Sequence, residues 1–287
     1  MAIDLYAVCW NEMRMLPYFI RHYQPWVDRF FIYDDGSTDG SVEYLRSFQN
    51  VEVRPLPHPY EDSLVDSHRH LYDHCWRQSR GFADWVVITN IDEHLYHADI
   101  TGYLSECQKK GITLIPAVGY QMFSAEFPHT EEKLCDVVQQ GVPYRMMNKL
   151  SLFNPTAIQH TNFAVGRHSA MPEGLIVYPE LDELRLLHYK FLGYEYLSGR
   201  WNELSTGLRT RDIANHWGYH YLSDKEASLN EYMTLKSSAE RVIYPGVPPE
   251  KRNVHKRWWR PNPLKKRRKI TRGIRKWLEK ARKTPPV

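Results

Sequence analysis

The sequence has 287 residues, a mass of 34.1 kDa and a formal net charge of +4, from 38 basic and 34 acidic residues. The charge is unevenly divided, because residues 251–287 carry 16 of the basic residues and one acid, Glu279. The first 250 residues therefore form an acidic body of about −11, which is followed by a basic tail of about +15.

The composition excludes several classes of protein. A hydrophobic content of 42% and an aromatic content of 13% are too high for a disordered chain. We find no run of about 18 apolar residues that could cross a membrane, and the acidic start MAIDLYAVCW does not resemble a signal peptide. The cysteines form no CxxC pair and are expected to be free thiols in a cytoplasmic protein: Cys9, Cys75, Cys107 and Cys135.

Strand and helix signals alternate over residues 1–125. The pattern predicts strands at 5–10, 29–34, 51–56, 84–92 and 112–123, and helices at 15–23, 41–48, 64–80 and 100–110. This alternation predicts an α/β fold with a mostly parallel sheet flanked by helices.

The second half of the body, residues 126–245, has a less regular pattern. Short strands are predicted at 149–154 and 185–190, a loop at 166–174, and helices at 195–204 and 223–238, the last with Ser223 as its N-cap. A segment rich in proline and glycine (244–252) then leads into the tail, so we expect a body of residues 1–245 and a tail of residues 246–287.

Polar side chains follow three of the predicted strands. In open α/β sheets, ligands bind at the carboxyl ends of the strands, so these positions predict a ligand site. The sequence contains neither GxGxxG nor GxxxxGK[ST], which disfavours a dinucleotide-binding or P-loop enzyme. The polar groups are Asn11 and Glu12, then Asp34, Asp35 and Ser37, and finally Asn90, Asp92 and Glu93.

Two segments resemble family-2-type glycosyltransferases of the GT-A fold. They are WNEMRMLPYFIRHYQPWVDRFFIYDDGSTDGS, at residues 10–41, and NIDEH, at residues 90–94, which is similar to the DxDEF-like segment of one branch. The resemblance implies an enzyme that moves a sugar from a nucleotide-sugar donor to an acceptor, with inversion at the anomeric carbon. Residues 1–125 would then form the nucleotide-binding half and residues 126–245 the acceptor half.

The resemblance also implies roles at the ends of the first two strands. Trp10 would stack on the nucleotide base, with Asn11 and Glu12 nearby, and Asp35 would accept hydrogen bonds from the base or the ribose. A UDP-sugar is the expected donor. Helix capping is the alternative explanation for the other polar residues of the DDGSTDGS turn.

A divalent metal ion is expected on the donor diphosphate, where carboxylates would hold Mn²⁺ or Mg²⁺ against the charge of the leaving group. The resemblance assigns Asp92 and Glu93 as metal ligands, with His188 completing the site. Asn90 occupies the first position of the DxD-like motif, where it can still bind a ribose hydroxyl.

Further candidates come from the second half of the sequence. Lys149, His168 and His188 lie in segments that resemble one series of family positions, which implies that Lys149 neutralises phosphate, that His168 helps to bind the donor, and that His188 could instead donate to the diphosphate. An inverting transferase also needs a carboxylate that deprotonates the acceptor hydroxyl. Asp182 and Glu126 are the leading choices for this base, and the other candidates are Glu131, Glu132, Glu173 and Glu183.

Two other interpretations of the enzyme class stay open. A nucleotidyltransferase on a similar fold would usually carry a glycine-rich basic loop after the first strand, which this sequence lacks. A non-catalytic nucleotide-sugar-binding protein is suggested by Asn90. Two pairs of histidines have a helical spacing that can bind zinc, but no third ligand or HExxH motif accompanies them, which favours a packing role: His70 with His74, and His216 with His220.

The tail predicts a basic amphipathic helix. Its apolar stripe consists of Ile270, Ile274, Trp277, Leu278 and Ala281, and the rest of the helix surface is almost entirely Lys and Arg. Such helices bind anionic membrane surfaces, and we expect the protein to sit at the inner face of a membrane, with a glycan or lipid-linked acceptor of bacterial surface polysaccharide or lipopolysaccharide synthesis. Nucleic acid, a solvated tail and a tail docked on the body are the alternatives.

Overall fold

A computed structural model describes residues 1–244, 253 and 255–260 of the chain. The chain divides into two compact units, Met1–Val254 and His255–Val287. In the second unit the rings of Trp258 and Trp259 pack edge to face, with centroids 5.3 Å apart. The amphipathic helix predicted around residues 270–281 lies outside the described residues.

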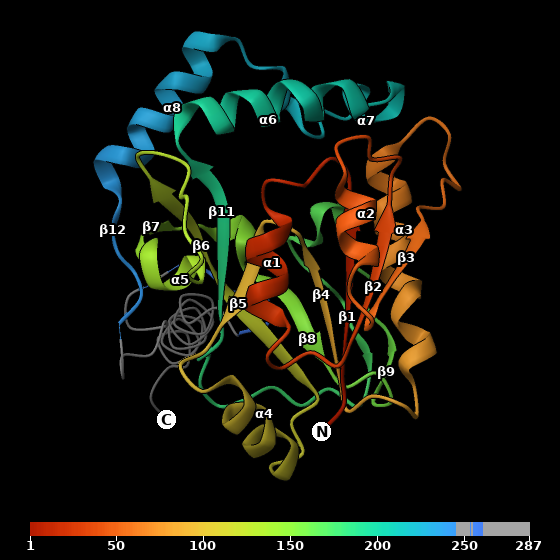
Figure 1. The fold of residues 1–287 in the computed structure, drawn as a ribbon. Coiled ribbons are helices and arrows are strands. Elements are labelled where there is room, and N and C mark those ends of the chain that lie inside the picture. Colours follow the sequence, from red (N-terminus) through yellow and green to blue (C-terminus); the bar gives the residue numbers. More distant parts are fainter. Residues whose placement is uncertain (245–252, 254, 261–287) are drawn as a thin grey trace, which may run out of the picture. The chain divides into compact units, whose positions relative to one another are not determined.

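The first unit is built on one ten-stranded sheet, shown in Figure 1. The strands follow the order β12-β7-β6-β8-β4-β1-β2-β3, and β11 pairs with both β5 and β6. Their bounds are β1 (Ile3–Cys9), β2 (Arg29–Asp34), β3 (Val51–Pro55), β4 (Trp85–Asn90), β5 (Glu93–Tyr96), β6 (Leu114–Ser124), β7 (Gln140–Pro143), β8 (Lys149–Phe153), β11 (Arg185–Leu192) and β12 (Glu240–Arg241). A separate two-stranded sheet joins β9 (Ile158–His160) and β10 (Glu173–Gly174).

The half of the sheet formed by β3, β2, β1 and β4 is parallel. β1 lies between β2 and β4, with Ala7 opposite both Ile32 and Thr89. Its residues are almost all buried, which explains why the sequence shows a continuous apolar run rather than alternation. The expected α/β fold, with a large sheet flanked by helices, is confirmed.

The other half of the sheet is mixed. β8 is antiparallel to both β4 and β6, while β11 runs parallel to β6 and antiparallel to β5. The sequence predicts one strand over 84–92, but the chain turns after Asn90 and begins the short strand β5 at Glu93. This turn brings Asp92 to the edge of the sheet and places Glu93 opposite His188 of β11.

The six predicted helices lie close to their expected positions, whereas the short helices α5 and α7 were not predicted. The segment predicted as one helix at 64–80 is α3 followed by a 3₁₀ turn, η1 (Cys75–Ser79), and Asp224 rather than Ser223 caps α8, accepting from the amide of Ala227. In Figure 1, α6, α7 and α8 run across the top of the view. The helices are α1 (Leu16–Tyr23), α2 (Ser41–Arg46), α3 (Leu64–His74), α4 (Ile100–Lys109), α5 (Leu134–Val137), α6 (Tyr194–Gly207), α7 (Thr210–Ala214) and α8 (Lys225–Ser238).

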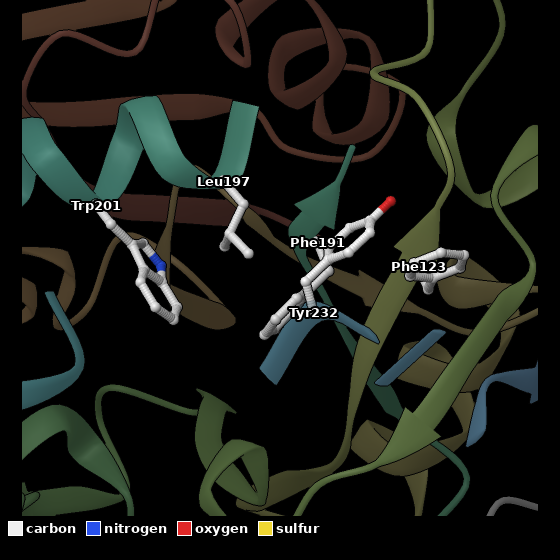
Figure 2. Close-up of a cluster of buried hydrophobic side chains, with 5 residues drawn as sticks. All are labelled: Phe123, Phe191, Leu197, Trp201 and Tyr232. Carbon is white, nitrogen blue, oxygen red and sulfur yellow. The ribbon is translucent and has the colours of Figure 1, made fainter. Parts of the chain in front are cut away.

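A buried aromatic cluster fixes α6 and α8 to the sheet. Figure 2 shows its members, which come from β6, β11, α6 and α8: Phe123, Phe191, Leu197, Trp201 and Tyr232. Each is at most 7% exposed, so the cluster anchors α6 firmly over the end of β11. In the part of the chain that the structure describes, no helix is long and apolar enough to cross a membrane.

Candidate active site

Asp92 and His188 meet at the turn between β4 and β5. Asp92 Oδ2 lies 2.9 Å from His188 Nε2, and the other ring nitrogen, Nδ1, lies 2.5 Å from Gln121 Oε1. The backbone amide of Tyr189 donates to the Asp92 carbonyl, so β11 holds this turn in place. Burial raises the pKa of the Asp92 carboxyl, but the charge and hydrogen bond of His188 outweigh it and leave the pKa below its usual value.

Glu93 has a different environment from Asp92, although the two residues are adjacent. Its side chain is 0% exposed, against 25% for Asp92. One carboxylate oxygen lies 2.6 Å from Lys149 Nζ and the other 2.7 Å from Arg167 Nη2. Burial would raise the pKa of Glu93, but these two cations hold it well below the usual range. Both oxygens are thus engaged inside the protein.

Asn90 and His168 border this buried ion cluster. Asn90 donates from Nδ2 to Glu93 Oε1 over 3.1 Å and accepts at Oδ1 from the hydroxyl of Tyr72 over 2.9 Å. The ring of His168 contacts the Met146 carbonyl through Nδ1, at 2.5 Å. Asn90 therefore links the cluster to α3, and the sequence-predicted Asn90, Lys149 and His168 do lie together.

Glu12 lies at the end of β1 and is bound by an arginine of α6. Arg200 Nη2 lies 2.6 Å from Glu12 Oε1 and also donates to the Trp10 carbonyl over 2.9 Å. Arg200 Nη1 forms an ion pair with Glu203, which in turn accepts from Asn11 Nδ2 over 2.7 Å. Burial raises the pKa of Glu12, and Arg200 opposes this shift. The end of β1 is thus tied to α6 by a network of charges.

The ring of Trp10 packs against the end of α6. A Cβ atom at Gly207 would lie 3.1 Å from the Trp10 ring and 3.4 Å from Leu64, so the Trp10 ring packs closely on the backbone of α6 at this glycine. Trp10 is therefore held between the carboxyl end of β1 and the helices α3 and α6.

Asp34 and Asp35, at the end of β2, have separate partners. Asp34 Oδ2 accepts from the amides of the following turn, at Gly36 and Ser37, which is a structural role. Asp35 Oδ1 instead lies 2.8 Å from His58 Nε2, and His58 Nδ1 lies 3.1 Å from Arg209 Nη2. Burial raises the pKa of Asp35, while His58 opposes this change.

The two leading candidates for the general base lie in different places. Glu126 is exposed and follows β6, near Gly193 at the start of α6. Asp182 is buried before the amino end of β11, whereas Asp92 lies beside Tyr189, farther along this strand. The structure therefore brings Glu126, but not Asp182, to the edge of the sheet that carries Glu12 and Asp92.

The donor atoms near Asp92 fit a divalent ion that shares its ligands with a substrate. Within residues 1–244, 253 and 255–260, no group of three His, Cys, Asp or Glu side chains could hold a metal ion. Asp92 and His188 form a pair in which His188 Nδ1 faces Gln121 Oε1 and Nε2 faces Asp92 Oδ2, so Nε2 and the carboxylate are the two atoms that would hold a metal. Two protein ligands are enough when phosphates supply the others.

Several residues of the site have no signal in the sequence. Arg200 lies 188 positions from Glu12, and Arg167 lies 74 positions from Glu93, so no local spacing connects either pair. Arg167 could have been suspected only from its neighbour His168, and Arg200 stands on an ordinary amphipathic helix. Only the folded chain shows that both are ion-pair partners of sequence-predicted acids.

Solved structures with some similarity to the chain include the following. TarS of S. aureus in complex with UDP-GlcNAc is 10% identical, with a TM-score of 0.39 over 70% of this chain and 67% of that chain. Glucosyl-3-phosphoglycerate synthase from Mycobacterium tuberculosis, with Mn²⁺, UDP and glucosyl-3-phosphoglycerate, is 20% identical, with a TM-score of 0.27 over 42% of this chain and 44% of that chain. The chain spans 39% of the TarS 1–349 chain bound to UDP, at 10% identity and a TM-score of 0.32.

The sequence itself identifies the family. No curated protein matches it. The sequence profile of glycosyltransferase family 92, however, matches residues 10–217, which include the residues that follow β1 and the ends of β2 and β4, as well as β11 and α6. The glycosyltransferase character expected from the sequence is thereby confirmed, and the protein belongs to glycosyltransferase family 92.

Proposed function

We propose that the protein transfers a sugar from a UDP-sugar to a glycan or lipid-linked acceptor, with inversion, on a GT-A-type fold. The observation that carries this proposal is the meeting of Asp92, His188 and Glu12 at the carboxyl edge of the sheet, in a chain of glycosyltransferase family 92. The charge of Asp92 acts on Glu12, so the two carboxyls are electrostatic neighbours.

The nucleotide would bind at the ends of β1 and β2. Trp10 offers a flat ring for the base, and Asn11 lies beside it. Asp35 and His58 offer hydrogen-bond partners for the base or ribose. Arg200 would meet the donor phosphates, because it reaches Glu12 from α6.

Asp92 and His188 would hold Mn²⁺ or Mg²⁺, which neutralises negative charge on the diphosphate when it is bound. Glu93, Lys149 and Asn90 keep the turn that carries Asp92 in place. Of the two leading candidates, Glu126 suits the role of the base for the acceptor hydroxyl better, because it lies at the same edge of the sheet.

Removal of the Asp92 charge should abolish metal-dependent nucleotide binding. Saturating UDP with Mn²⁺ should raise the Tm of the wild-type protein by about 5 °C or more. The Asp92→Asn and His188→Gln variants should lose this shift, and UDP release from a panel of UDP-sugars should fall at least about 100-fold. The measurements are thermal unfolding and a UDP-release assay.

The matched control is Glu180→Gln, which removes one exposed carboxylate that precedes β11 and has no proposed contact with the donor. It should keep both the Tm shift and the release of UDP. Unchanged turnover in Asp92→Asn would refute the assignment of Asp92. Mn²⁺-dependent UDP binding without sugar transfer or donor hydrolysis would instead favour a non-catalytic binding protein.

We further propose that the basic tail attaches the enzyme to the inner face of a membrane, where lipid-linked or surface glycans are built. The support for this proposal is the charge of about +15 in residues 251–287 and the predicted apolar stripe. The family and the tail together suggest a role in bacterial surface polysaccharide or lipopolysaccharide synthesis.

A further inference from the structure

Lys190 is a cation next to the candidate site that has aromatic neighbours but no counter-ion among the described residues. It follows His188 by two residues on β11 and is partly buried. Its ammonium group lies 4.8 Å from the centroid of the Trp201 ring and 5.0 Å from that of Tyr221. Trp201 belongs to the buried cluster of Figure 2, so this face of the ammonium site is rigid.

No acid within the described ranges lies within ion-pair distance of Lys190. The charges of Asp92 and Glu231 act on it from farther away. Two neighbouring polar atoms are also buried without a hydrogen-bond partner among those residues, namely Nε1 of Trp201 and Nε2 of His220. The rings of Trp201 and His220 contact each other, with centroids 5.5 Å apart. Buried polar groups of this kind are costly unless a ligand satisfies them.

The position of this group relative to α6 indicates which substrate would meet it. Arg200 of α6 reaches towards Glu12 and the end of β1, where the nucleotide is proposed to bind. The next residue, Trp201, packs on β11 instead. Lys190 therefore lies on β11 near the Asp92–His188 pair. The nucleotide base and the ribose are proposed to bind elsewhere, at the ends of β1 and β2.

We propose that Lys190, Trp201 and His220 form a subsite for an anionic group of the acceptor, either a carboxylate or a phosphate. The ammonium supplies the charge, and the Trp201 and Tyr221 rings hold it in place through cation–π contacts. This subsite rests on the proposed function for its identification with the acceptor, but its affinity for an anion can be tested separately.

The test uses methyl phosphate as the probe and the full-length protein, at constant ionic strength. Calorimetric titration should show binding to the wild-type protein and binding at least about tenfold weaker in Lys190→Met, which keeps the aliphatic stem but loses the charge. Lys236→Met, on the exposed face of α8, removes the same charge and should leave the affinity unchanged. Equal affinity in the wild type and Lys190→Met, or no binding to the wild type, would overturn the proposal.

A second arm of the experiment distinguishes the two possible sources of the anion. With saturating UDP and Mn²⁺ present, methyl phosphate should still bind, because the subsite belongs to the acceptor. If UDP displaces methyl phosphate, the acceptor assignment is overturned, and Lys190 binds the diphosphate of the donor instead. If UDP does not bind at all but methyl phosphate binds through Lys190, the proposed function fails while the anion site stands.

A third variant covers the possibility that Lys190→Met does not fold. His220→Phe keeps a flat ring next to Trp201 but removes the unpaired Nε2. It should also weaken the binding of methyl phosphate. An unchanged affinity in folded His220→Phe would contradict the assignment of His220 to the subsite.

Discussion

Glu93 is the residue on which the buried part of the site depends. It accepts from Lys149, Arg167 and Asn90, and none of its surface is exposed. Arg167 also donates to the Ile88 carbonyl over 2.8 Å, which ties the cluster to β4. One carboxylate against two cations leaves a positive charge inside the protein, directly behind the turn that carries Asp92.

The loss of the Glu93 charge should therefore destabilise the fold. Glu93→Gln keeps the shape of the side chain but leaves Lys149 and Arg167 buried without a counter-ion, which should cost about 3–5 kcal/mol of unfolding free energy. Urea denaturation measures this change. The control is Glu52→Gln, because Glu52 pairs with Arg54 at the surface. This substitution should lower the free energy of unfolding by less than about 1 kcal/mol. Equal effects in the two variants would contradict the structural role of Glu93.

At the scale of elements, α1 and β5 pack through two histidines that are buried without charge. The rings of His22 and His94 stack with centroids 4.6 Å apart, and His22 Nε2 lies 2.7 Å from the Leu95 carbonyl. Neither nitrogen of His94 has a hydrogen-bond partner among the residues described. Burial lowers the pKa of His22 to about 4 and that of His94 well below 6.5.

This histidine pair predicts a loss of stability in acid. Between about pH 6.5 and pH 4 the unfolded chain binds protons at these positions and the folded chain does not. Above about pH 6.5 these two histidines do not change the free energy of unfolding. Below that pH, the free energy of unfolding should fall by about 1.4 kcal/mol per pH unit for each of the two histidines as the pH decreases. Urea midpoints at pH 7.5, 6.5 and 5.5 measure the slope.

Replacement of one histidine should reduce that slope. His94→Phe removes one of the two buried imidazoles and should flatten the dependence on pH, whereas His129→Phe changes an exposed histidine and should leave it unchanged. The same slope in His94→Phe as in the wild type would show that other groups cause the sensitivity to acid.

Elements with strong local patterns could be predicted from the sequence, and those set by tertiary contacts could not. β2 was predicted with its observed bounds, because its run of apolar residues ends at a turn rich in Asp and Gly. β5 was not predicted as a separate strand. It has only four residues and follows β4 closely in the sequence, so only its pairing with β11 identifies it as a strand of its own. The acids at the strand ends carry a local signal, whereas Arg167, Lys190 and Arg200 meet them only after folding.

At the scale of the whole molecule, opposite charges are separated along the sequence. The acidic body contains the candidate site, and the basic excess lies beyond residue 250. The boundary between the two compact units falls after Val254, close to the point where the basic excess begins. Residues 261–287 can be removed without deleting any residue of a described helix or strand.

Removal of residues 261–287 should reduce membrane binding but not activity. Basic residues near an anionic surface contribute about 1 kcal/mol each, so cosedimentation with vesicles rich in phosphatidylglycerol should be lost and should depend on salt in the full-length protein. Release of UDP and the urea midpoint should stay unchanged. Preserved vesicle binding, or a collapse of the urea midpoint, would refute a separate membrane-binding role.

The contact between Asp92 and His188 has a consequence for how the protein is made. The two residues are 96 positions apart, and β11 must pair with β5 and β6 before they meet. The parallel strands β1, β2 and β3 are complete by residue 55 and can associate much earlier during synthesis. A ribosome-bound chain that ends before β11 could therefore fold much of the proposed nucleotide-binding half but could not form the Asp92–His188 pair. The candidate active site is thus completed late in translation.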